Sequence, residues 1–173
     1  ETLLEMEDVV GIAELMDYVG ICNDAERMHA IIDKGIEKKA FLQGHAPFVT
    51  GKELAAYRIG GPVSDHESES AAEVVEKLRN GIHINLRASS LVNHLPLLAE
   101  GLKSVPYHDF VSICTDDVHA NDLLSLGHIN KVVRYAIESG LEPVDVIRMA
   151  TINAAREYGF GELGAVAPGY AAD

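Results

Sequence analysis

The 173-residue sequence predicts an α/β fold in which a parallel sheet is built from repeated βα units. Short apolar runs alternate with longer amphipathic stretches along the chain, and a polar loop and a helical pattern follow each apolar run. Hydrophobic residues make up 47% of the chain and charged residues 24%, which are ordinary values for a globular protein with a core. Intrinsic disorder and a coiled coil are therefore both disfavoured.

The expected strands are short and recur at intervals that leave room for one helix or loop between them. They cover residues 9–13, 40–44, 61–64, 82–86 and 110–115. The tail, residues 164–173, is rich in small and turn-forming residues and stops where a further strand can begin.

Capping residues mark the expected helix boundaries. Asn23 or Asp24 is expected to cap a helix that runs to about Lys39. The motifs that begin at Thr50 and Ser70 match the capping box, in which a hydroxyl and a carboxylate three residues later satisfy backbone donors reciprocally. Further helices are expected over residues 121–139, over residues 143–150 with a proline in the first turn, and over a short stretch after residue 153.

Charge and cysteine content exclude several classes of partner. The chain has 14 Lys and Arg against 27 Asp and Glu, a formal net charge of -13, which disfavours nucleic acid polymers and anionic membrane surfaces. No apolar run reaches the length of a membrane span. Cys22 and Cys114 lack the paired spacing of a zinc knuckle or a disulfide framework, so we expect a cytoplasmic protein in a reducing compartment.

Side chains of the kinds that bind metals follow the expected strands. His45, His66 and Asp116 each come after a strand, and Glu14 follows the first apolar run. In a parallel barrel the carboxyl ends of the strands form one rim, so these groups are expected to converge. Imidazole and carboxylate together suit Zn, Fe or Mn, and such an ion lowers the pKa of bound water toward about 7.

Taken singly, each of these residues also has an ordinary explanation. A histidine after a strand more often pairs with a loop or helix than with a metal ion. Asp116 alone is a reasonable helix cap, and Glu14 alone a solvated or paired carboxylate. Their common placement after strands favours one shared site.

Five sequence motifs occur in a fixed order: GIAELM at residues 11–16, GHAP at 44–47, SDHE at 64–67, TDD at 115–117 and MATINAA at 149–155. This ordered set resembles the adenine deaminases of the amidohydrolase superfamily over nearly the whole chain. The resemblance implies the C-terminal portion, about strands four to eight, of a (β/α)8 TIM barrel within residues 1–160. Residues 161–173 would then begin the connection to a β-sandwich domain.

The resemblance also implies a binuclear divalent metal centre, with Mn or Fe preferred and Zn as a further option. Glu14 would bridge or bind the metals, His45 and His66 would ligate the second, and Asp116 would bind the first. Asp116 would also accept the proton of the hydroxide that attacks C6 of adenine, giving hypoxanthine and ammonia in purine salvage. Glu67 is the candidate for handling the proton at N1 of the purine or for contacting the purine edge.

The remaining site assignments are implied by position alone. Asp117 and His119 are expected to orient Asp116 or the leaving amine. Arg87, just after an expected strand, either contacts the substrate or pairs with a carboxylate.

The chain departs from the family in one respect, because it contains no His-x-His pair, which in amidohydrolases ends the first strand. A whole barrel takes about 250 residues. We therefore expect the first strands to lie in a longer parent protein and the isolated chain to be inactive.

Two alternatives stay open. One is an amidohydrolase acting on a cyclic amide, like a hydantoinase or dihydroorotase, although those enzymes usually carry a carboxylated lysine where this chain has Glu14. The other is a non-catalytic partial barrel, whose unpaired edge strands need a partner chain or a second copy. For the parent we expect a homo-oligomer with adenine as its small-molecule substrate.

Overall fold

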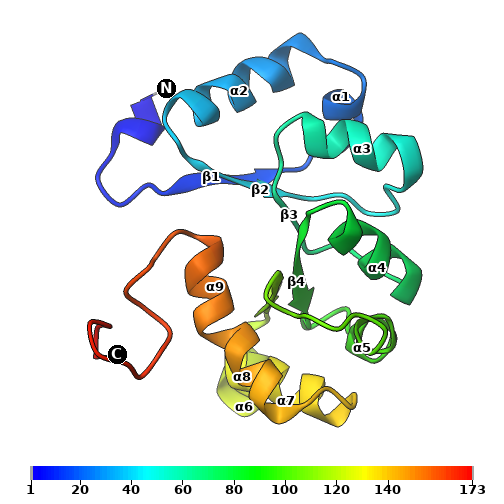
Figure 1. The fold of residues 1–173 in the computed structure, drawn as a ribbon, viewed down its shortest axis with the longest axis vertical. Coiled ribbons are helices and arrows are strands. Elements are labelled where there is room, and N and C mark those ends of the chain that lie inside the picture. The colour runs from blue at the N-terminus through cyan, green and yellow to red at the C-terminus, as the bar shows by residue number, and fades with distance from the viewer. Residues whose placement is uncertain (1, 173) are drawn as a thin grey trace.

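The computed structural model describes residues 2–172, and within them it contains five short strands. Each overlaps a predicted apolar run, although the third strand shares only Ser64 with the run predicted over residues 61–64. Figure 1 shows them along the middle of the molecule, with the helices packed around them. The strands are β1 (Gly11–Leu15), β2 (Phe41–Gly44), β3 (Ser64–Asp65), β4 (His83–Arg87) and β5 (Val111–Cys114).

All the strand pairs are parallel, as the βα rhythm predicts. β1 pairs with β2 in one sheet, and β3, β4 and β5 pair in that order in a second sheet. The two sheets touch where the Val63 N–H donates to the Leu42 carbonyl at 3.1 Å. The five strands therefore follow one another in chain order, which brings their carboxyl ends to one edge.

Helices occupy most of the chain between the strands. None of the helices in the described residues is long and apolar enough to cross a membrane. After a 3-10 turn η1 (Thr2–Glu5), they are α1 (Tyr18–Cys22), α2 (Glu26–Glu37), α3 (Gly51–Ile59), α4 (Ala71–Arg79), α5 (Leu95–Leu102), α6 (Ala120–Ser125), α7 (Ile129–Glu138), α8 (Pro143–Ala150) and α9 (Ile152–Glu157).

The prediction that Asn23 or Asp24 caps α2 is wrong. A helix that the pattern did not reveal, α1, occupies the preceding residues, so Asn23 lies at its C-terminal end and donates from Nδ2 to the Val19 carbonyl at 2.8 Å. α2 begins only at Glu26. Asn23 therefore serves the end of one helix rather than the start of the next.

Both capping-box motifs do begin helices, but neither forms the reciprocal box. Ser70 Oγ accepts from the Glu73 N–H at 3.2 Å, whereas the Glu73 carboxylate accepts from the Glu69 N–H at 3.0 Å. Within residues 2–172, Thr50 forms no side-chain cap, and the Gly51 N–H instead donates to Glu76 Oε1 at 2.7 Å. Carboxylates of α4 thus cap a neighbouring loop.

The single helix predicted over residues 121–139 is also wrong. Gly127 has a φ of 95°, a left-handed conformation that ends α6. Asn130 Oδ1 then accepts from the His128 N–H at 2.8 Å, which starts α7 in a new direction. In the described part of the tail, residues 164–172, the chain forms turns without a helix or strand.

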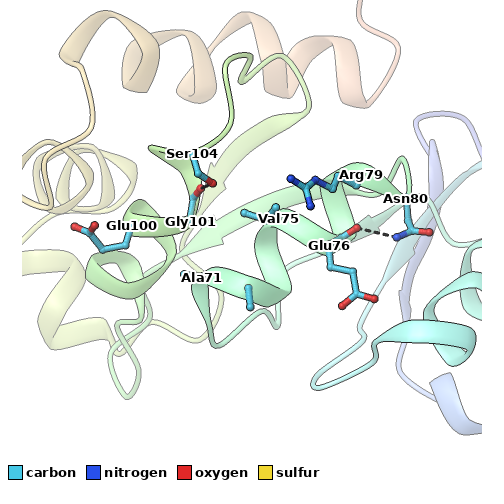
Figure 2. A pocket seen from close by; sticks show the side chains of 9 residues that line it. Ala71, Val75, Glu76, Arg79, Asn80, Glu100, Gly101 and Ser104 are labelled. Carbon is cyan, nitrogen blue, oxygen red and sulfur yellow. Dashed lines mark hydrogen bonds between the residues drawn. The ribbon is translucent and has the colours of Figure 1, made fainter.

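The core lies between the strands and the helices outside them. Ile82, Ile84 and Leu86 are fully buried on one side of the chain at β4. α4 and α5 pack closely, because a Cβ at Gly101 would lie 2.6 Å from the Ala71 carbonyl oxygen. Figure 2 shows the surface groove between these two helices, of about 570 Å³. The alternate residues of β4, which include Arg87, face the other side of the strand from this core and can therefore contribute to a site.

Candidate metal centre

Four predicted ligands come together at the carboxyl ends of the strands. Glu14 lies near the end of β1, His45 and His66 directly follow β2 and β3, and Asp116 lies beyond β5. Three of them, Glu14, His66 and Asp116, line a cavity of about 360 Å³ together with Ala13, Gln43 and Cys114. Parallel strands in chain order thus place these residues together, as the sequence predicts.

Glu14 lies between the two histidines. Its Oε2 is 2.8 Å from His66 Nε2, and its Oε1 is 3.7 Å from His45 Nδ1. The two imidazole rings meet edge to face, with centroids 5.4 Å apart. One ligand atom from each of the three residues lies within 4.8 Å of the others. This spacing suits a single cation held between them.

The donor set fits a divalent metal ion. Among the described residues, His45 Nδ1 and His66 Nδ1 are buried without a hydrogen-bond partner. Such a buried polar atom costs roughly 1–3 kcal/mol unless something pairs with it. Imidazole nitrogen beside carboxylate oxygen is a set that borderline divalent ions prefer. Glu14, His45 and His66 therefore have the geometry for a metal ion. Within residues 2–172, His45 Nδ1, 3.7 Å from Glu14 Oε1, is in addition a nitrogen without a hydrogen-bond partner on the side of the site, whereas His66 faces Glu14 through Nε2.

A second group of ligand atoms adjoins the first. His66, Glu67 and Asp116 also place one ligand atom each within 4.8 Å of one another. From the sequence, Glu67 is expected to handle the proton at N1 or to contact the purine edge, and it is not expected to be a metal ligand. The structure adds Glu67 to the groups that can contact a second ion.

Arg87 takes the ion-pair role that the sequence left open. Its guanidinium binds the Glu67 carboxylate through two contacts, Nη2 to Oε2 and Nη1 to Oε1, both at 2.9 Å. It also contacts the Asp116 carboxylate. Burial raises the pKa of Glu67, while the charges of Arg87 and the two histidines oppose that rise. Arg87 thereby fixes two carboxylates of the site relative to one another.

Asp117 and His119 lie outside this cluster. Their side chains are exposed, and within the described chain neither forms a hydrogen bond or ion pair with Asp116. Their backbone instead ties the loop to Ser90, whose N–H donates to the Asp117 carbonyl and whose Oγ accepts from the His119 N–H, both at 2.8 Å. They hold the loop that carries Asp116 through its main chain.

Three further residues contribute that sequence reasoning did not assign. Gln43 and Cys114 line the cavity, and period-two alternation within β2 and β5 is the signal that can reveal such inward positions. Burial raises the pKa of the Cys114 thiol to about 12. His128 Nε2 lies 2.9 Å from Thr115 Oγ1, next to Asp116, and no local pattern indicates that contact.

Known proteins are similar to this sequence over nearly its whole length. An adenine deaminase of Kosmotoga olearia is 42% identical over 169 residues, which cover 95% of this chain and 28% of that protein. An adenine deaminase of Serratia proteamaculans is 40% identical over 174 residues, covering 100% of this chain and 29% of that protein. The chain thus spans less than a third of the length of these curated relatives.

The fold has a likeness among solved structures. A crystal structure of an uncharacterized protein matches with a TM-score of 0.57 at 18% identity, over 84% of this chain and 40% of that one. A model of the amidohydrolase family matches residues 1–173. Because that match covers the whole sequence, the chain belongs to the amidohydrolase family.

Proposed function

We propose that the full-length protein containing this chain hydrolyses adenine to hypoxanthine and ammonia at a divalent metal centre. The observation that carries the proposal is the convergence of Glu14, His45 and His66 within 4.8 Å, beside a cavity that Asp116 also lines. The relatives named adenine deaminase support the choice of substrate.

The parallel strands support a (β/α)8 barrel as the architecture of the whole catalytic domain. On this proposal β1 to β5 are its strands four to eight, and residues 161–173 lead toward a further domain. Strands joined in chain order with helices outside them are the repeating unit of such a barrel. The active sites of these barrels lie at the carboxyl ends of the strands, where Glu14 and Asp116 are found.

Glu14, His45, His66 and Asp116 are the residues that would hold the metal, with Mn or Fe as the preferred ions and Zn as a further option. When bound, a divalent ion supplies the nucleophile by lowering the pKa of water toward about 7. The carboxylate of Asp116 accepts a proton from that water as its oxygen attacks C6 of adenine. Asp116 suits this task because it lines the same cavity as Glu14 and His66.

Glu67 completes the proton transfers. A neutral adenine ring is a poor electrophile until N1 gains a proton, and the protonated form of Glu67, which lies between His66 and Arg87, supplies it. Arg87 holds the Glu67 carboxylate in one orientation through its two contacts. The C6–N bond then breaks, and the amine leaves as ammonia with the proton that Asp116 took up. The proton left on the C6 oxygen returns to Glu67, which gives neutral hypoxanthine and restores the acid.

An assay of the full-length protein with adenine tests the proposal. Ammonia release should depend on added Mn or Fe and should be abolished by a chelator, with hypoxanthine formed in equal amount. Hydantoin and dihydropyrimidine serve as competing substrates. Hydrolysis of either cyclic amide without turnover of adenine would reject the deaminase assignment while leaving the metal centre standing.

A further inference from the structure

Lys77 is a fully buried lysine directly behind the metal centre. It lies on α4, and its side chain has no exposed surface. Its ammonium group donates to the Ala46 carbonyl at 2.7 Å, to Asp65 Oδ2 at 2.8 Å and to Glu73 Oε1 at 2.6 Å. A buried charge is retained only when it is paired in this way.

These contacts tie the two loops that carry the histidines. Ala46 directly follows His45, and Asp65 directly precedes His66. The loops are also joined to each other, because the Ala46 N–H donates to Asp65 Oδ1 at 2.8 Å. One ammonium group therefore holds the backbone next to one histidine and the side chain next to the other.

Glu73, one turn before Lys77 on α4, also forms hydrogen bonds with these two loops. Its Oε1 accepts from the Phe48 N–H and its Oε2 from the Glu69 N–H, both at 3.0 Å. Phe48 belongs to the loop after β2 and Glu69 to the loop after β3. Lys77 and Glu73, both on α4, thus form hydrogen bonds with both loops.

The charges in this cluster are tightly coupled. Burial alone raises the pKa of Asp65, but the charge of Lys77 and hydrogen bonds from Lys77, Ser68 and Ala46 hold it below its ordinary value. Buried ion pairs are often no more stabilising than apolar side chains of the same size. Stability alone therefore gives little reason for three buried charges at this place.

We propose that Lys77, Asp65 and Glu73 are positioning residues that set the spacing of His45 and His66 and so determine the affinity of the site for a divalent metal. The proposal rests on the metal centre proposed above. It concerns the backbone that carries the histidines, since neither imidazole contacts Lys77 among the described residues.

The variant Lys77→Met distinguishes two effects of Lys77 on metal affinity, the positioning of the histidine loops and the repulsion between its charge and the cation. Removing a positive charge near a cation site strengthens cation binding by Coulomb's law. Releasing the two loops weakens it, by about 10–100-fold for residues that orient metal ligands. The two effects have opposite signs, so the direction of the change identifies which one dominates.

A second variant guards against a folding defect. Lys77→Met combined with Glu73→Gln removes one charge of each sign, so the net charge of the cluster is unchanged. Asp65 is then the one carboxylate of the cluster that has lost its lysine. Asn153→Ala is the control. Asn153 is a buried residue outside the histidine loops, and its Nδ2 donates to the His108 and Val111 carbonyls. This substitution lowers stability without touching the site.

The measurement is the dissociation constant for Mn(II) on the full-length protein, together with the visible spectrum of the Co(II) form and the melting temperature. We expect the dissociation constant to rise about 10–100-fold in the single and double variants, with an altered Co(II) spectrum. Asn153→Ala should lower the melting temperature and leave both metal readouts unchanged. An unchanged or lower dissociation constant in the double variant overturns the positioning role, whereas a wild-type protein that binds no Mn(II) overturns the metal centre itself.

Discussion

Glu14 Oε2 lies 2.8 Å from His66 Nε2, although β2 separates the strands from which these residues come. The approach depends on Gly44 at the end of β2. A Cβ there would lie 2.1 Å from the Ser64 carbonyl oxygen and 2.2 Å from the Tyr57 hydroxyl. Tyr57 in turn accepts a hydrogen bond from the His45 N–H at 2.8 Å. A residue without a side chain thus allows three strands to bring their ends together.

Glu14→Gln should abolish most metal binding. The amide keeps the size of the carboxylate but removes the negative charge that lies between His45 and His66. Metal content per chain, measured by emission spectroscopy after dialysis, should fall well below that of wild type. Glu26→Gln, an exposed carboxylate on α2, should retain full metal content. Full retention in Glu14→Gln would show that this residue is no ligand.

Asp116→Asn should slow adenine turnover more than it weakens metal binding. The amide cannot accept a proton, and a positioned acid or base contributes about 10²–10⁴-fold to rate. The check is kcat for ammonia release at saturating metal, with Glu138→Gln on the exposed face of α7 as the control. A kcat within a few-fold of wild type would remove Asp116 from the proton transfer.

Gly101→Ala should destabilise the fold. The added Cβ would meet backbone atoms of Ala71, the nearest at 2.6 Å, and such overpacking costs about 1–3 kcal/mol. Denaturant unfolding measures the difference. Gly161→Ala is the matched control, because a Cβ there meets nothing within 4 Å. Equal stability of the two variants would mean that α4 and α5 can move apart freely.

Acidification should destabilise the protein partly through His83. Burial lowers the pKa of His83 from 6.5 to about 4, so the unfolded chain binds more protons than the folded one between these values. Its contribution is therefore complete above pH 6.5 and is lost as the pH falls toward 4, by at most about 1.4 kcal/mol per pH unit.

Glu157 also affects the pH dependence of stability in this range. Its carboxylate lies 3.2 Å from His83, and burial raises its pKa, so its contribution to stability changes with pH in the opposite direction to that of His83. The difference between wild type and His83→Gln isolates the histidine. Melting temperatures from pH 4 to 7 should fall less steeply with acid in the variant. Parallel curves would contradict the lowered pKa.

Local pattern predicted some elements well and others poorly. The apolar runs located β1, β2, β4 and β5, because a buried parallel strand needs a short hydrophobic stretch, whereas the run predicted over residues 61–64 meets β3 only at Ser64. Helix ends were less predictable. Glu73 has the sequence position of a capping-box carboxylate, yet its oxygens accept from Phe48 and Glu69, since buried backbone donors in neighbouring loops compete for them.

By itself the sequence determined the order of the strands and the identity of Glu14, His45, His66 and Asp116 as groups at strand ends. Both depend on local periodicity, which short stretches of chain already contain. Only the tertiary structure decided that Arg87 joins Glu67 to Asp116 and that Lys77 joins the two histidine loops. Burial makes an unpaired charge costly, so each buried charge takes whichever partner the packing of distant segments brings within reach.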